Sequence, residues 1–484
     1  MEQVKIGVIG GGASGMMAAI AAADKGSSVT LMEGGARVGK KLLSTGNGKC
    51  NLGNMKLSAE EYYGAPKEWT AACLEQFDTE DTIRFFEDAG LLLKDKNGYL
   101  YPKAEQASVV LDTLRIRLDE SGVRTITDCK VDDVRQDSEG GFVVRAGQER
   151  FHFDKVILTC GSKAAPKTGS DGSGYRLAKG LGHELVPVVP ALVQLRCREN
   201  YLKEVAGVRA EAVVTVLDGA RITADMGRSS AKAQMMADAG RTGEGARILE
   251  RGELQLTDYG ISGIPVFQLS RQVNYLLKPQ GALAEVEVSV NLMPEYTEQE
   301  FKAFCDKRKS LRDGRTVEEF FTGILNKKLM LLFIKLAGLN RDLPASEVDE
   351  GRLARVYALC RDWRLHVTGS NSYDNAQVCA GGVDTRQVGC NMESLLVPGL
   401  YFAGEILDVD GRCGGYNLQW AWCSGAIAGS SAAKQEGKEE DTYAADQSVK
   451  NKKRRGSCSQ SIGHGRTASA SADKGRKASA GLGE

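Results

Sequence analysis

The sequence lacks an excess of charge of either sign. It contains 63 basic and 63 acidic residues, so its formal net charge at neutral pH is zero. Such a chain has no overall field that would attract a nucleic acid or an anionic membrane surface. We therefore expect its partner to be a small molecule, with no nucleic acid and no membrane, and the sequence leaves the oligomeric state open.

Regularly spaced cysteines are also absent. The twelve cysteines are scattered and contain no CxxC pair, which argues against a disulfide framework, a disulfide reductase and a zinc site. We expect no bound metal, and the reducing cytoplasm is the compartment that fits this cysteine usage.

No apolar run has the length and composition of a signal peptide or a membrane span. The run from Val4 to Ala23 is interrupted by four glycines between positions 10 and 15, where a strand would pass into a helix. The run from Leu329 to Leu339 carries Lys335 and is far shorter than the ~20 residues that a membrane-spanning helix needs. The sequence therefore indicates neither a signal peptide nor a membrane span.

What the sequence does contain is a change of pattern along its 484 residues, a length that favours two or three domains. Strand, helix and strand patterns at 5–9, 13–25 and 28–32 predict a βαβ unit, strand patterns begin near 191, and helical spacing follows from about 298 to 339. We predict a discontinuous nucleotide-binding domain over 1–190 and 366–433, a β-rich domain over 191–297 and a helical subdomain over 298–365. The segment 434–484 has almost no large apolar side chains, and we predict that it is disordered.

A GxGxxG pattern stands between the first strand and the first helix, the setting in which this pattern binds a dinucleotide. Gly10 permits the tight turn, Gly12 lets a pyrophosphate approach the backbone, and Gly15 lets the helix pack close to the sheet. The N-terminus of the helix favours phosphate. Glu33 ends the second strand, where a carboxylate accepts hydrogen bonds from an adenosine ribose and repels a 2′-phosphate.

Three further stretches favour FAD over a nicotinamide as the bound dinucleotide. The glycine-rich basic loop from Gly39 to Asn51 is able to wrap a pyrophosphate, and the strand from Val156 to Gly161 ends in small residues that can pass beneath a dinucleotide. The stretch from Gly399 to Gln419 delivers a carboxylate and then begins a helix. The positive end of that helix would stabilise the negative charge of a reduced flavin.

The motifs of these stretches resemble those of the bacterial BaiN-like (YhiN-like) FAD flavoproteins, also labelled aminoacetone oxidase family or NAD(P)/FAD-dependent oxidoreductases. They are VIGGGASG, GKKLLSTGNGKCN, TDYGISGIPVFQLSR, CAGGV and GLYFAGEILDVDGRCGGYNLQWAWCSG, and the likeness spans about residues 4 to 430. The resemblance implies an α/β fold in which a Rossmann-like FAD-binding domain is interrupted by an inserted β-barrel-like domain and a small helical domain.

The resemblance also implies which residues approach the cofactor. Glu405 and Asp408 would approach the ribityl chain or the pyrophosphate, residues Gly415 to Gln419 the isoalloxazine, and Val131 the adenine. The complete set of residues that we expect at the cofactor is Gly10, Gly12, Ala13, Ser14, Gly15, Glu33, Lys40, Lys41, Thr45, Gly46, Asn51, Val131, Thr159, Gly161, Gly404, Glu405, Asp408, Gly415, Tyr416, Asn417, Leu418 and Gln419.

For the reaction, the resemblance implies reduction of C=C bonds conjugated to a ketone, with 3-dehydro-4,6-dienoyl bile acids as the expected substrates and NADH or NADPH as the co-substrate. Tyr416 and Tyr259 are the candidate proton donors, and Arg412 is the candidate for polarising a carbonyl. Lys49 stands where many members have Arg, and Asp258 stands where many have His, which argues against histidine chemistry at that position.

Two other functions fit the same sequence. The first is a FAD-dependent amine oxidase, of the aminoacetone type, that passes electrons to oxygen and forms peroxide. The second is a flavin-binding module without turnover. The basic run from Lys452 to Arg455 also resembles a nucleic-acid-binding arm, although a solvated charge run is the simpler interpretation.

Overall fold

The computed structural model describes residues 3–217, 248–277 and 285–434. The tail that the sequence predicts to be disordered therefore lies outside the described residues, apart from Lys434. Among the helices of the described ranges, none is long and apolar enough to cross a membrane.

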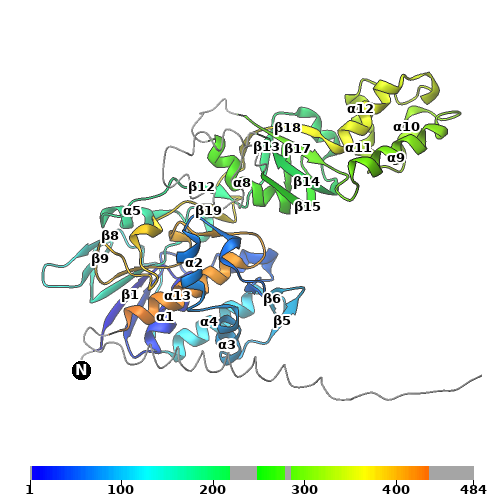
Figure 1. Cartoon of the computed structure of the whole chain (residues 1–484). Helices are drawn as coiled ribbons and strands as arrows, with labels where there is room; N and C mark the ends of the chain where they lie inside the picture. Colours follow the sequence, from blue (N-terminus) through cyan, green and yellow to red (C-terminus); the bar gives the residue numbers. More distant parts are fainter. Residues whose placement is uncertain (1–2, 218–247, 278–284, 435–484) are drawn as a thin grey trace, which may run out of the picture. The chain divides into compact units, whose positions relative to one another are not determined.

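A five-stranded sheet with the order β20-β11-β1-β2-β7 forms the framework of the nucleotide-binding domain. Every neighbouring pair of its strands is parallel. The strands are β1 (Lys5–Ile9), β2 (Ser28–Met32), β7 (Arg124–Ile126), β11 (Lys155–Leu158) and β20 (Leu400–Phe402). The predicted Rossmann-like domain is confirmed, and its sheet takes strands from both halves of the chain (Figure 1).

Two helices, α1 (Ala13–Ala23) and α13 (Tyr416–Ala432), pack side by side (Figure 1). A Cβ on Gly425 would lie 2.5 Å from the Ser14 carbonyl oxygen, and a Cβ on Gly429 would lie 2.2 Å from that of Ala18. Glycine is therefore the residue that allows this approach. Because the contacts advance together along both helices, the helices are parallel, and a rise of 1.5 Å per residue places the start of α13 about 12 Å beyond that of α1.

Smaller elements surround the parallel sheet. The helices are α2 (Lys67–Leu74), α3 (Thr79–Asp88), α4 (Ala107–Glu120) and α5 (Ser173–Gly180). The strands are β3 (Gly53–Asn54), β4 (Tyr62–Tyr63), β5 (Leu93–Lys96), β6 (Tyr99–Pro102), β8 (Asp133–Gln136), β9 (Phe142–Ala146), β10 (Glu149–Phe153), β12 (Val189–Ala191), β19 (Val378–Ala380) and β21 (Asp410–Gly411). Strand β21 pairs with β4, and this pairing fixes the segment that leads into α13.

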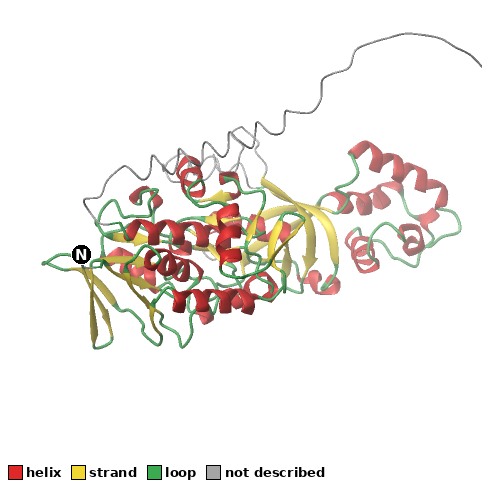
Figure 2. Ribbon diagram, turned by 90° about the horizontal axis from the view of Figure 1, so that it is seen from below, coloured by secondary structure: helices red, strands yellow, loops and turns green. Residues whose placement is uncertain are grey.

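The inserted β-rich segment closes into a six-stranded antiparallel barrel with the order β13-β16-β15-β14-β17-β18. Its strands, drawn in yellow in Figure 2, are β13 (Leu195–Cys197), β14 (Arg209–Val216), β15 (Ile248–Leu256), β16 (Gly260–Gly263), β17 (Val286–Asn291) and β18 (Trp363–Ser370). Val214, Leu254 and Val288 are buried, alternate with less buried positions along their strands and fill the interior. The predicted barrel-like domain is confirmed.

Helices are inserted at two places in the barrel sequence. Helix α8 (Ile264–Leu277) directly follows β16 and buries Val266, Leu269 and Val273, which recur at helical spacing. The second insertion lies between β17 and β18 and contains α9 (Glu298–Arg308), α10 (Val317–Phe321), α11 (Lys327–Leu336) and α12 (Glu350–Arg361). Strand β18 thus returns the chain to the barrel after the helical segment, over residues that the sequence pattern divided between the helical subdomain and the nucleotide-binding domain.

Candidate functional site

A cavity of about 1700 Å³ runs along the carboxyl ends of β1, β2 and β11 and continues to the start of α13. Ligands of open parallel sheets bind at this edge. Its walls combine the glycine turn, the basic loop and the α13 start with one side of the barrel helix α8. Segments from four distant parts of the sequence therefore meet around one space.

The glycine turn forms one end of the cavity, and a different physical reason favours glycine at each of positions 10, 12 and 15. Gly10 has a φ of +110°, and a Cβ on Gly15 would lie 1.9 Å from the Gly10 carbonyl oxygen. A Cβ on Gly12, in contrast, would meet no protein atom within 4 Å and would stand in the cavity. The turn therefore leaves an open cradle at the N-terminus of α1, which fits the phosphate of a dinucleotide.

Glu33 faces the same turn from the end of β2. Its Oε2 accepts a hydrogen bond from the Gly11 amide at 2.8 Å, and its Oε1 accepts one from the Gly35 amide at 2.8 Å. The carboxylate lines the cavity and also orders the backbone on either side of it. This position fits the ribose contact that the sequence predicts.

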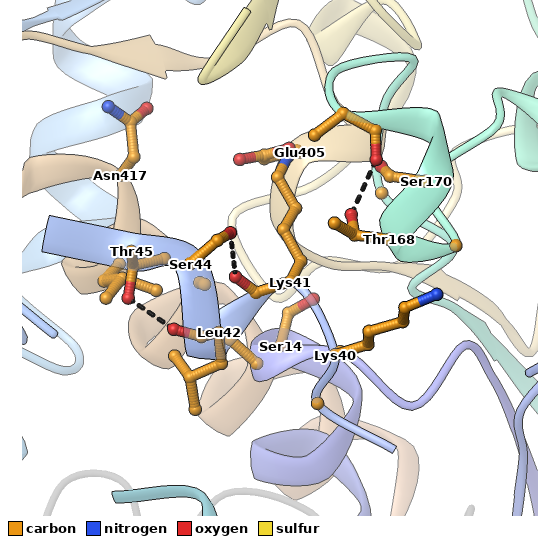
Figure 3. Close-up of a pocket in the computed structure, with 18 of the residues that line it drawn as sticks. Ser14, Lys40, Lys41, Leu42, Ser44, Thr45, Thr168, Ser170, Glu405 and Asn417 are labelled. Atoms are coloured by element: carbon orange, nitrogen blue, oxygen red, sulfur yellow. Dashed lines mark hydrogen bonds and ion pairs between the residues drawn. The ribbon is translucent and has the colours of Figure 1, made fainter. Parts of the chain in front are cut away.

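The basic loop and the C-terminal motif meet across the cavity at an ion pair. Lys41 Nζ lies 2.6 Å from Glu405 Oε2, which also accepts a hydrogen bond from Ser162 Oγ at 3.1 Å. Lys40 extends away from this pair, as Figure 3 shows, and its Nζ donates to the Lys167 carbonyl oxygen at 2.7 Å. The two adjacent lysines thus tie the loop to two different segments beside the sheet.

The start of α13 forms the other end of the cavity. Gly414 and Gly415 have φ values of +121° and +95°, and a Cβ on Gly415 would lie 2.4 Å from the Gly53 carbonyl oxygen. Asn417 fixes the preceding turn, since its Oδ1 accepts from the Gly411 amide and its Nδ2 donates to the Gly411 carbonyl oxygen. Both long parallel helices therefore point their N-termini at the cavity, where their partial positive charges favour an anionic or electron-rich ligand.

The comparisons with known proteins match this architecture. The model of the HI0933-like protein Rossmann domain matches residues 4–431. The chain is 41% identical, over 432 residues, to the 3-dehydro-bile acid delta(4,6)-reductase of Clostridium scindens, covering 89% of this chain and 99% of that one. The chain belongs to the HI0933-like family. The family resemblance and the expectation of a FAD-type Rossmann flavoprotein are thereby confirmed.

The chain is also similar, at lower identity, to proteins with a different function. The chain is 27% identical, over 435 residues, to the ribosomal RNA dihydrouridine synthase of Haemophilus influenzae, covering 88% of this chain and 98% of that one. Among solved structures, 3-ketosteroid-delta4-(5alpha)-dehydrogenase from Rhodococcus jostii is 17% identical with a TM-score of 0.43, covering 90% of this chain and 98% of that one.

Most residues that the sequence predicts at the cofactor of this family member line the cavity. They are Gly10, Gly12, Ala13, Ser14, Glu33, Lys40, Lys41, Thr45, Gly46, Asn51, Val131, Thr159, Gly161, Glu405, Gly415, Tyr416, Asn417 and Leu418. Gly15, Gly404, Asp408 and Gln419 are described but lie outside this lining.

Three of the residues outside the lining pack against, or form hydrogen bonds with, other parts of the protein. A Cβ on Gly404 would lie 2.4 Å from Ser14 Oγ, so this glycine allows close packing behind α1. Gln419 is fully buried, accepts from Thr82 Oγ1 and donates to the Asp78 carbonyl oxygen. Asp408 accepts from the Gly381 amide at 3.0 Å, and burial raises its pKa to about 7. Asp408 is therefore a buried residue that does not line the cavity, whereas Glu405 of the same motif does.

The three candidate catalytic residues fall in different places. Tyr416 lines the cavity, its hydroxyl donates to the Lys56 carbonyl oxygen at 3.3 Å, and burial raises its pKa to about 12. Tyr259 lies at the β15–β16 turn, outside the lining formed by the described residues, and its ring faces the Arg196 guanidinium at 5.2 Å. The structure thus keeps Tyr416 at the site and removes Tyr259 from it.

Arg412 also lines the cavity, but carboxylates already surround it. Its Nη2 lies 2.7 Å from Glu250 Oε2 on the barrel strand β15, and its Nε lies 3.3 Å from Glu61 Oε2. Burial alone would lower the pKa of Arg412, yet the bond to Glu250 holds it above its usual range. Two carboxylates offset the charge of this guanidinium. Arg412 therefore links two distant segments, and its ability to polarise a carbonyl group is reduced.

Sequence reasoning missed the apolar side of the cavity. Leu192, Ile264, Phe267 and Val378 line it, together with Tyr99 from β6. Ile264 and Phe267 lie in the first turn of α8, within the motif TDYGISGIPVFQLSR. The motif was the available signal, but its apolar residues do not reveal by themselves which of them face a ligand.

The Glu33 contact gives a direct prediction. Glu33→Arg should weaken FAD binding about tenfold or more, about 1.4 kcal/mol, because it removes the acceptor for two amides and places a cation at the predicted ribose position. Equilibrium dialysis with flavin fluorescence measures the dissociation constant. Glu347→Arg, with the same charge change at an exposed position of the helical insertion, is the control. Equal FAD retention in both variants would contradict the ribose assignment.

Proposed function

We propose that this protein is a FAD-dependent reductase that saturates C=C bonds conjugated to a ketone, using NADH or NADPH. 3-Dehydro-4,6-dienoyl bile acids are the proposed substrates. The observation that carries the proposal is the single cavity that joins two glycine-turn helix starts to an apolar wall from the inserted barrel. We assign the dinucleotide to the first part and a flat polycyclic ketone to the second.

The functions of the relatives support a C=C bond conjugated to a carbonyl group as the bond that is reduced. The Clostridium scindens relative is named as a delta(4,6)-reductase of 3-dehydro bile acids, and it covers nearly the whole chain. The ribosomal RNA dihydrouridine synthases saturate a uracil C=C bond that is also conjugated to a carbonyl group. The bond type is therefore common to both groups, while the higher identity and the apolar residues Leu192, Ile264, Phe267 and Val378 favour the steroid.

The proposed reaction balances without oxygen. Each saturated C=C bond takes up a hydride and a proton, so one NAD(P)H is oxidised to NAD(P)⁺ and one proton is consumed. FAD, when bound, supplies the hydride relay between nicotinamide and substrate. Gly12 and Glu33 would hold its phosphate and ribose, and the start of α13 would lie at its ring.

The chain's own groups have distinct proposed roles in this reaction. Tyr416 keeps its proton at neutral pH, because burial raises the pKa of its hydroxyl to about 12, and it is the proposed proton donor at the cavity wall. Arg412, held by Glu61 and Glu250, positions the turn before α13. Ile264 and Phe267 exclude water from the substrate side and contact its apolar face.

Anaerobic flavin reduction followed by reoxidation tests the proposal. We expect NADH or NADPH to bleach the flavin of the purified protein, and a 3-oxo-4,6-diene bile acid to restore its colour with stoichiometric loss of the diene. A saturated 3-oxo bile acid, which lacks the C=C bonds, is the matched control and should leave the flavin reduced.

The alternatives give different outcomes in the same apparatus. Bleaching by an amine, with peroxide formed in air and no response to nicotinamide, would replace the proposal with the amine oxidase. Stable FAD that neither nicotinamide nor amine reduces would make the protein a flavin-binding module.

We also propose a cytoplasmic protein whose partners are small molecules, because the cysteines of the described ranges are all free thiols, as in reducing compartments.

A further inference from the structure

A buried ion pair joins the barrel helix α8 to the strand that precedes α13. Arg271 Nε lies 2.9 Å from Asp410 Oδ1, and each side chain is only 4% exposed. The Arg271 guanidinium also lies 5.0 Å from the ring centre of Tyr63 and 5.5 Å from that of Tyr275. Neither member of the pair lines the cavity.

Two more contacts from the barrel side reach the same turn. Gln268, one helical turn before Arg271 on α8, accepts a hydrogen bond from the Cys413 amide at 3.1 Å. Glu250 of β15 forms an ion pair with Arg412, which also lies between these two contact points. Residues of the barrel side therefore bond to residues 410, 412 and 413, which directly precede the glycines at the start of α13.

Helix α8 is also hydrogen-bonded to the segment around β12. Ser270 Oγ accepts from the Val193 amide, and Asn274 Nδ2 donates to the Pro190 carbonyl oxygen at 2.8 Å. Helix α8 is thus fixed to the segment that carries the cavity residue Leu192 and, through Gln268 and Arg271, to the α13 start. A shift of α8 would move both walls of the cavity.

The chemistry of the pair indicates positioning rather than net stabilisation. Removing two charges from water costs about as much as their attraction returns, so an apolar pair of similar size would hold the fold equally well. A guanidinium that is bonded to a carboxylate and flanked by two aromatic rings, however, is restricted to one orientation. The pair therefore specifies where the turn lies.

We propose that Arg271 is a positioning residue, which acts through Asp410 to fix the N-terminus of α13 at the end of the cavity where the flavin ring is proposed to bind. This role rests on the proposed function. The inserted barrel then has two tasks, since it supplies the apolar wall and fixes the helix start that the opposite wall contributes.

The test uses variants of the full-length protein that separate geometry from stability. Arg271→Met combined with Asp410→Leu removes both charges, and we expect an unfolding midpoint close to that of the unchanged protein. We expect FAD binding to weaken at least tenfold, with a shifted visible spectrum and flavin midpoint potential. Arg271→Lys alone, which keeps the charge, should recover part of the affinity and spectrum. Arg312→Met, which removes a half-buried arginine from the helical insertion, is the control and should leave the flavin unchanged.

A second readout needs no flavin. In ligand-free protein we expect amide hydrogen exchange of a peptide spanning 411–420 to be at least tenfold faster in the double variant, with barrel peptides unchanged. Glu250→Gln, outside the cavity lining, should move exchange and affinity in the same direction by less, and it carries the test if the double variant does not fold. Unchanged exchange in the variants that fold overturns the positioning role, and so does unchanged FAD affinity in a protein that binds FAD. An unchanged protein that binds no FAD would instead overturn the proposed function, while the exchange result would still decide whether the pair holds the turn.

Discussion

Gly12→Asp should abolish FAD retention while the protein remains folded. A Cβ at this position meets no protein atom within 4 Å, and its φ of −79° and ψ of −169° suit any residue. Aspartate is a slightly better helix N-cap than glycine, so we expect the stability of the ligand-free protein to be unchanged or raised by roughly a few tenths of a kcal/mol. Its carboxylate would occupy the phosphate cradle, take up the amide donors and repel the pyrophosphate.

We expect this loss of affinity to be roughly 100-fold or more, about 2.7 kcal/mol. Titration of the ligand-free protein with FAD gives the affinity, and denaturant unfolding gives the stability. Gly15→Ala is the matched comparison three residues away, because its Cβ would lie 1.9 Å from the Gly10 carbonyl oxygen and 2.7 Å from Thr159 Oγ1. That variant should lose stability as well as FAD. Normal FAD binding by Gly12→Asp would show that the cradle is not the phosphate site.

The parts of the site that sequence predicted well are those in which one short motif carries the whole requirement. The separate roles of Gly10, Gly12 and Gly15 follow from the turn alone, and each has its expected geometry in the structure. The strand, turn and helix before and after them lie within about thirty residues, so local pattern was sufficient. The same holds for the helix start at Gly415.

What sequence could not supply are contacts between distant segments. The sequence indicated that Arg412 was an available cation, because nothing in the neighbouring residues shows that Glu61 and Glu250 both pair with it. Asp408 sits in the same motif as Glu405, yet a single turn sends one carboxylate to the cavity and the other behind its wall. Helix α8 had helical spacing at Val266, Leu269 and Val273, but its role depends on Asp410, far along the chain.

The parallel pair of helices gives the second large effect, at Gly429. Alanine there gains up to ~1 kcal/mol in helix propensity, but its Cβ would lie 2.2 Å from the Ala18 carbonyl oxygen, which belongs to the backbone and cannot rotate away. Overpacking of this kind costs about 1–3 kcal/mol or more. We therefore expect Gly429→Ala to lower the free energy of unfolding by about 2 kcal/mol, measured by denaturant titration.

The position of this clash connects stability to the site. Because α1 and α13 each begin at the cavity, forcing their backbones apart displaces one N-terminus relative to the other, and FAD affinity should fall together with stability. Gly180→Ala, at the end of α5, is the control: its Cβ meets no atom within 4 Å, so the substitution should be neutral or stabilising, with FAD binding intact. If Gly429→Ala behaved like this control, the two helices would not be held by the close contact, and their joint orientation toward the cavity would need another cause.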